Sequence, residues 1–229
     1  MNFVFKKTSG LIAVGIFAVL TTLLLLTELI PSYSLYLMPK MALFLAASAF
    51  LCVGAGLLRS ATSAVDHKAK ITRSALWSVM GLYLLVLGSF LFWDKGFART
   101  TDWANYAQAF ANHLRHRTNF MPFYSIHQYA TKSALRGVAA VNLLGNLLAF
   151  APMGFLLPAL ARNLQKPWAF FVTMLCLLVL VETAQLLLVL GSCDIDDIIL
   201  NIAGAAAVFA LTKLPPLRKR LAAWGLMAA

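Results

Sequence analysis

Residues 168–190 read WAFFVTMLCLLVLVETAQLLLVL, and this stretch decides the class of protein. It is long enough to cross the hydrocarbon core of a bilayer as a helix, which takes about 20 apolar residues. Its only charged residue is Glu182. A backbone inside lipid must satisfy its own hydrogen bonds, and a helix does so within one segment. The stretch therefore predicts a transmembrane helix.

Five more apolar blocks are candidate spans, although the last of them, Ile198–Thr212, is short. Of all residues in the chain, 61% are hydrophobic and only 12% are charged, about half the charged share of a typical soluble domain. The sequence lacks the sustained alternation of apolar and polar residues that is typical of transmembrane barrel strands. We therefore expect an all-α polytopic transmembrane helix bundle of about six spans: Leu11–Ile30, Leu37–Leu58, Ala75–Trp93, Val138–Ala161, Trp168–Leu190 and Ile198–Thr212.

Two basic features lie near span ends. Lys6 and Lys7 precede the first apolar block as in a signal peptide, but the block is too long for one, so we interpret it as a retained helix. Lys40 lies inside the second block close to its end, where we expect its side chain to reach the interface.

Charge predicts the orientation of the spans. The formal net charge is +11, but the basic residues lie between apolar blocks, which favours membrane orientation and anionic lipid over a nucleic-acid partner. With the N-terminus in the cytoplasm, most of the 19 Lys and Arg are cytoplasmic and both termini lie inside. The seven outer ones are Lys40, Lys95, Arg99, Arg115, Arg117, Lys132 and Arg136.

The longest polar stretch, 94–136, is the predicted outer loop between the third and fourth spans. Trp103, Tyr106, Phe110 and Leu114 recur at three- and four-residue steps, which predicts a helix lying in the outer interface. The alternative is a small soluble cap packed on the bundle. Residues 117–123, RTNFMPF, are too apolar for a free loop, and we expect them to return to the membrane.

Polar residues recur in the last three spans. Asn142 and Asn146 are one turn apart, and Glu182 and Gln185 are three residues apart, so each pair shares a helix face. We expect Pro152 to loosen the fourth span. On the last span, Asp194, Asp197, Asn201 and Gly204 form one stripe down one side of the helix. The predicted orientation brings seven of these polar residues to the outer half of the membrane: Asn142, Asn146, Glu182, Gln185, Asp194, Asp197 and Asn201.

A carboxylate inside a span is costly, so we interpret Glu182 as facing a partner or an interior cavity. Arg117 is a candidate partner for Glu182 or the aspartates. The alternatives are packing and hydrogen-bonding roles for the asparagines and for Gly145 and Gly204, and solvated aspartates at a helix N-terminus. The candidate site residues are Arg117, Asn119, Asn142, Asn146, Glu182, Gln185, Asp194, Asp196, Asp197 and Asn201.

No metal or cofactor signature is present. The three cysteines lack the spacing of a disulfide framework or a zinc site, and the histidines match no zinc signature. The aspartates at 194, 196 and 197 lack the glycine and distant glutamate of a calcium loop. There is no phosphate loop or nucleophile elbow. We therefore expect no cofactor and no metal, and the sequence names no catalytic residue.

The last 115 or so residues resemble the VanZ-like family, named for a protein associated with teicoplanin resistance. The resemblance rests on RTNFMPF at 117–123, NLLGN at 142–146 with Phe150, Pro152 and Gly154, ETAQ at 182–185, and GSCDIDD at 191–197 with Asn201 and Gly204. Ser192 stands where many members carry an arginine, and Ala205, Ala206 and Ala207 alter the glycine-rich end of the last span.

The resemblance implies a protein of the bacterial cell envelope, linked in some members to tolerance of lipoglycopeptide antibiotics, and it implies no reaction. It divides the chain into a two-helix extension (1–74), a VanZ-like membrane domain (75–215) and a short basic cytoplasmic tail (216–229). Our leading hypothesis is an outward-facing polar pocket that binds an envelope lipid, a lipid-linked intermediate or a lipoglycopeptide.

Two other functions stay open. One is an intramembrane enzyme acting on a lipid-linked substrate, with Glu182 and Asp197 as acid/base groups or metal ligands. The other is a small transporter or flippase with Glu182 as a proton relay. The absence of an internal repeat and of paired discontinuous helices counts against a typical secondary transporter. The sequence does not indicate an oligomeric state.

Overall fold

The computed structural model of the protein describes residues 2–30, 35, 37–92, 103–131 and 136–227. Contacts divide the chain into two compact units. The first comprises Met1–Asp94 with Ala222–Ala228, and the second comprises Lys95–Leu221 with Ala229.

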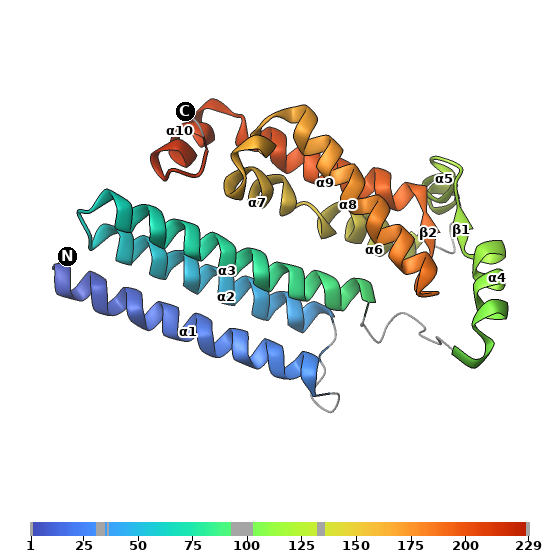
Figure 1. Ribbon diagram of the computed structural model, residues 1–229, viewed down its shortest axis with the longest axis horizontal. Helices are drawn as coiled ribbons and strands as arrows, with labels where there is room; N and C mark the ends of the chain where they lie inside the picture. Colours follow the sequence, from blue (N-terminus) through green and yellow to red (C-terminus); the bar gives the residue numbers. More distant parts are fainter. Residues whose placement is uncertain (1, 31–34, 36, 93–102, 132–135, 228–229) are drawn as a thin grey trace. The chain divides into compact units, whose positions relative to one another are not determined.

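Three long helices form the first unit: α1 (Phe3–Leu29), α2 (Leu37–Ser60) and α3 (Val65–Phe92). They run side by side, and α2 packs against both α1 and α3 (Figure 1). Glycines let α1 and α2 approach closely, because a Cβ built on Gly10 would lie 2.8 Å from Leu58 Cγ and one on Gly54 would lie 2.9 Å from Val14 Cγ2. Small residues at a helix contact are typical of membrane bundles.

Lys40 does not reach an interface, and the snorkelling prediction for it is wrong. Its side chain is buried, with Nζ 2.9 Å from Glu28 Oε1 and 2.8 Å from Ser89 Oγ. The Ser89 hydroxyl donates in turn to Glu28 Oε2 at 2.7 Å. Glu28, Lys40 and Ser89 thus form a closed ring of polar contacts that joins all three helices. A charge removed from water is stabilised best by a hydrogen-bonded counter-charge, which Glu28 supplies to Lys40.

The second unit contains the remaining helices and a two-residue strand pair. In chain order its elements are η2 (Trp103–Asn105), α4 (Tyr106–His116), β1 (Thr118–Asn119), α5 (Tyr124–Thr131), α6 (Arg136–Ala149), α7 (Met153–Leu160), η4 (Arg162–Gln165), α8 (Pro167–Leu187), β2 (Cys193–Asp194) and α9 (Ile195–Thr212). The last helix, α10 (Pro215–Ala223), carries the basic tail and runs from the second unit into the first.

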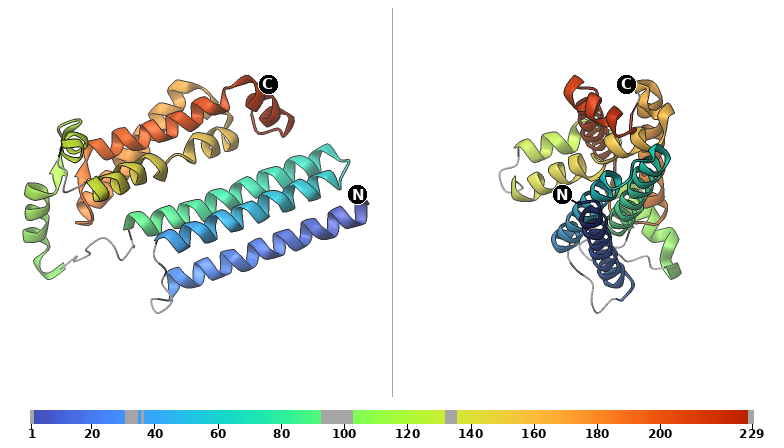
Figure 2. Two further views of the ribbon diagram at one scale, coloured as in Figure 1. Left: turned by 180° about the vertical axis from the view of Figure 1, so that it is seen from behind. Right: turned by 90° about the vertical axis from the view of Figure 1, so that its left-hand side faces the viewer.

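Helix α9 organises the second unit, since it packs against α6, α7 and α8 (Figure 2). The close approach depends on glycine. A Cβ on Gly204 would lie 1.7 Å from the Leu147 carbonyl oxygen of α6, and one on Gly154 would lie 2.2 Å from the Ala205 carbonyl oxygen. Deeper in the unit, the rings of Phe170 and Phe209 stack with centroids 4.3 Å apart. These contacts fix how the last spans face each other.

Within the described residues, six apolar helices are long enough to cross a membrane, which confirms the six predicted spans. The third begins ten residues earlier than expected, at Val65 rather than Ala75, because the polar segment before the apolar block is also helical. The fourth is interrupted as expected, since α6 ends at Ala149 and α7 starts after Pro152.

The predicted outer-loop helix is present as α4, and its position in the interface stays a prediction. The segment 117–123 contains β1 and the turn that leads to α5, an arrangement that its apolar composition did not indicate. Its return to the membrane stays a prediction, as does the domain division at residues 74 and 215.

Candidate functional site

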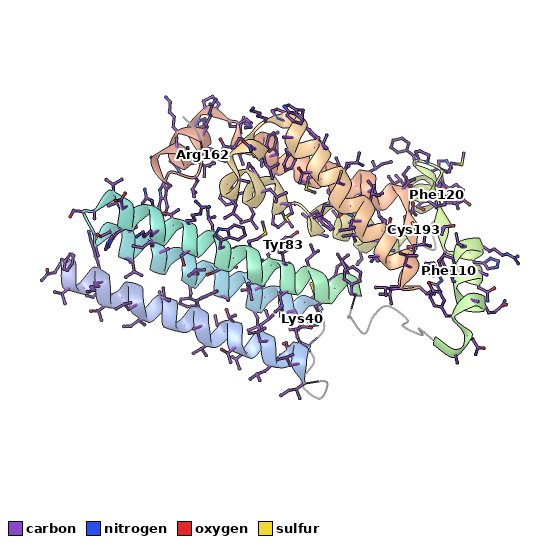
Figure 3. The ribbon with its side chains drawn as sticks, viewed as in Figure 1. Lys40, Tyr83, Phe110, Phe120, Arg162 and Cys193 are labelled. Carbon is purple, nitrogen blue, oxygen red and sulfur yellow. The ribbon has the colours of Figure 1, made fainter. Side chains whose placement is uncertain are left out.

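A short parallel strand pair brings together segments that lie 75 residues apart in the chain. Thr118 pairs with Cys193, and Asn119 pairs with Asp194. The Cys193 N–H donates to the Arg117 carbonyl oxygen at 2.9 Å. This pairing places the end of α4 and the start of α5 beside the N-terminus of α9. Phe120, Cys193 and Phe110 accordingly lie at one end of the second unit (Figure 3).

Asp194 is the N-cap of α9. Its Oδ1 accepts from the Asp196 N–H at 2.9 Å, which satisfies a helix-terminal donor, and a negative charge there is favoured by the helix dipole. The same carboxylate accepts from Asn119 Nδ2 at 2.9 Å and from the Ser125 hydroxyl. Asp194 thus joins three segments of the chain.

Asp196 is only 1% exposed, so the solvated alternative is wrong for this residue. Its two carboxylate oxygens accept from the backbone N–H groups of Phe123 and Ile126, the latter at 3.1 Å. Those donors belong to the turn after β1 and to the first turn of α5. Asp196 therefore holds the backbone of that turn against α9.

Asp197 faces α6 and accepts from Asn146 Nδ2. One turn further along α9, Asn201 is 5% exposed, and its side-chain oxygen has no hydrogen-bond donor among the described residues. Asn142 is directed elsewhere, since its Nδ2 donates to the Tyr129 hydroxyl of α5 at 3.2 Å. The two asparagines of α6 thus donate hydrogen bonds to different helices, Asn142 to α5 and Asn146 to α9.

Glu182 is 7% exposed on α8, and its Oε2 accepts from the Asp194 N–H at 3.3 Å. This contact joins the fifth predicted span to the start of the sixth, as the sequence hypothesis requires. Burial, followed by the neighbouring Glu182 and Asp194 carboxylates, raises the pKa of the Cys193 thiol to about 11. The thiol is therefore neutral at physiological pH.

The Arg117 side chain is placed differently from the hypothesis. The Arg117 side chain is exposed and makes no ion pair with Glu182 or the aspartates in the part of the chain that the structure describes. Its contribution is the carbonyl that anchors β2. The Gln185 side chain lies toward the turn at Gly191, and its backbone carbonyl accepts from the Leu190 N–H at 2.8 Å.

His113 is buried in the last turn of α4. Its burial and the charge of Arg117 lower the pKa of its imidazole. This histidine is therefore neutral at physiological pH. Sequence reasoning did not single out Ser125, Tyr129 or Cys193 as members of the site. Their contacts come from the strand pair and from α5, and no spacing in the sequence indicates them.

Four carboxylates from two helix ends converge here: Glu182, Asp194, Asp196 and Asp197. Within the described residues none of them forms an ion pair, and no three His, Cys, Asp or Glu side chains are arranged to hold a metal ion. Amide, hydroxyl and backbone donors supply the contacts instead. The arrangement can accept hydrogen bonds from a donor-rich or cationic group.

Fold and site together define a multi-pass helical membrane protein with a carboxylate cluster where its last two spans meet. The family model VanZ/LLP1 matches residues 80–216, which is more than half of the chain and includes the whole cluster. The chain therefore belongs to the VanZ/LLP1 family. No curated protein and no solved structure matches it.

Proposed function

We propose that the protein is a VanZ-like protein of the bacterial cytoplasmic membrane whose carboxylate cluster binds the polar head of an envelope lipid, a lipid-linked intermediate or a lipoglycopeptide. The convergence of Glu182, Asp194 and Asp197 carries the proposal. Carboxylates withdrawn from water are costly unless donors or a cation satisfy them. Each carboxylate oxygen can accept more than one hydrogen bond, so a head group rich in hydroxyl, amide or ammonium donors would add to the donors already present.

The hydrogen-bonded frame supports selective binding. Asp194 and Asp196 are held by the strand pair and the turn before α5, so their positions are set before a ligand arrives. Preorganised acceptors lose little conformational entropy on binding. Asn201 adds a buried carbonyl oxygen without a donor among the described residues, one turn from Asp197 on α9.

The topology predicted from the charge distribution supports such a ligand as well. With the N-terminus in the cytoplasm, the cluster lies near the outer surface, where envelope intermediates and antibiotics meet the membrane. Teicoplanin carries an acyl chain, so a site at membrane level can distinguish it from vancomycin. We infer that expression in a susceptible Gram-positive host raises tolerance to teicoplanin more than to vancomycin.

The test compares Glu182→Gln, Asp197→Asn and Asp66→Asn at equal membrane abundance. Asp66 is exposed in the first turn of α3 and serves as the matched control. Each change removes one charge and keeps the shape. Loss of teicoplanin tolerance in the first two variants alone would support the proposal. Wild-type tolerance from Glu182→Gln would leave packing as the role of that residue.

Two further assays distinguish the competing functions. Metal-dependent turnover of a lipid-linked substrate by the purified protein would favour an intramembrane enzyme. Dependence of the phenotype on the proton gradient would favour a transporter or flippase with Glu182 as the relay. Saturable binding without either response supports the proposal.

A further inference from the structure

The turn between β1 and α5 exposes large apolar side chains. Phe120 and Met121 are each 67% exposed, Phe123 is 61% exposed and Tyr124 is 49% exposed, with Pro122 between them. We call residues 120–124 the apolar turn. It lies outside the six candidate spans, so its exposure is not that of a helix face within the bilayer core.

The backbone of the apolar turn is held in place. The Asn119 side-chain oxygen accepts from the Met121 N–H at 3.0 Å, and the buried Asp196 accepts from the N–H of Phe123. Phe123 has φ 64°, a left-handed conformation that a bulky residue rarely adopts without support. Its neighbours therefore maintain a strained turn that directs large apolar groups outward.

The position of the turn follows from the strand pair. It leaves β1 directly beside β2, and β2 is followed at once by α9, which is a candidate span. The apolar turn therefore lies at the level where a span begins. Aromatic side chains and methionine are suited to the boundary between head groups and acyl chains.

The distribution of charged residues around the apolar turn indicates the kind of partner that contacts it. Residues 118–126 carry no charged side chain, whereas Arg115, His116 and Arg117 immediately precede them and are exposed. An apolar tip next to cationic residues complements a leaflet that has phosphate at its surface and hydrocarbon below. A protein partner would match the apolar side chains but would not by itself account for the adjoining basic group.

We propose that the apolar turn inserts into the head-group boundary of an anionic phospholipid leaflet, and that Arg115 and Arg117 contact the lipid phosphates. The turn would anchor the end of the second unit that carries the carboxylates. This proposal does not depend on what the carboxylates bind, since the partner is the surrounding leaflet.

The test places a photo-crosslinking phenylalanine analogue at Phe120 in the full chain, reconstituted in nanodiscs of phosphatidylglycerol or phosphatidylcholine. Asn112 is the matched control position, because it is exposed on α4 and lies away from the Phe110 face of that helix. Both positions are exposed, so the analogue leaves the packed core unchanged. The readout is the mass of lipid attached to the protein.

We expect several-fold more lipid adduct at 120 than at 112, with a higher yield in phosphatidylglycerol that falls toward the phosphatidylcholine value at about 1 M salt. Equal yields at 120 and 112 would overturn the proposal, as would adducts at 120 that are predominantly a second copy of the chain. Equal yields in the two lipids would overturn the assignment of an anionic leaflet.

Discussion

Replacing Gly204 by alanine tests the packing that brings the site together. A Cβ at this position would lie 1.7 Å from the Leu147 carbonyl oxygen, and real Cβ contacts are essentially never shorter than 3.0 Å. The atom in the way belongs to the backbone of α6, so no change of side-chain rotamer can make room for the new Cβ. Helices α6 and α9 must therefore move apart. The same movement would pull Asn146 away from Asp197.

Overpacking of this kind costs about 1–3 kcal/mol, and a hydrogen bond to a charged group contributes about 1.5–3 kcal/mol. Alanine recovers about 1 kcal/mol of helix propensity over glycine. We expect a net loss of about 3 kcal/mol for Gly204→Ala, which corresponds to a fall of roughly 6–12 °C in unfolding midpoint for a chain of this size.

Gly145→Ala is the matched control. Gly145 lies on α6, and a Cβ there would meet nothing within 4 Å. We expect an unchanged or slightly higher unfolding midpoint. The assay is thermal unfolding of each purified variant in one detergent, followed by tryptophan fluorescence. Equal midpoints for the two variants would refute the close α6–α9 contact.

Three further predictions concern other parts of the molecule. Lys40→Met should destabilise the first unit by about 3 kcal/mol, the lower end of the range for breaking a buried ion pair, because it leaves the half-buried Glu28 carboxylate without its counter-charge. Adding Glu28→Gln should restore much of the unfolding midpoint, and additive losses would contradict the pairing. With its pKa raised to about 11, the Cys193 thiol at pH 8 should react with a water-soluble maleimide about 100-fold more slowly than an ordinary thiol. In a chain without the other cysteines, the rate should keep rising with pH to about 11, and a plateau near pH 9 would contradict the burial. Reporter fusions after Arg73 and at the C-terminus should read cytoplasmic and a fusion near Asn112 external, whereas an external C-terminus would remove the six-span topology.

Much of the fold follows from hydropathy alone, because a span must be both long and apolar and few other structures satisfy that condition. The break at Pro152 and the shared face of Asp197 and Asn201 follow from local rules of the same kind. The strand pair does not. Two-residue strands carry no periodicity, and their pairing depends on backbone hydrogen bonds between segments distant in the chain, such as Arg117 to Cys193.

Side-chain partners were harder to predict for the same reason. The position of Lys40 near a span end favoured snorkelling, and only packing of α1 against α2 shows that Glu28 lies within reach. Asp196 and Asp197 are neighbours in sequence with identical chemistry, yet one supports a turn and the other faces α6. Which aspartate takes which role depends on α5, whose position the sequence does not indicate.

The most direct test of the central claim is native mass spectrometry of the protein extracted from a bacterial membrane, with the bound lipids identified. The account predicts that the wild type retains a defined envelope lipid or lipid-linked intermediate. It predicts that Glu182→Gln and Asp197→Asn lose this lipid while Asp66→Asn keeps it. Retention of the same lipid at the same occupancy by all four proteins would contradict a role for the carboxylate cluster in binding.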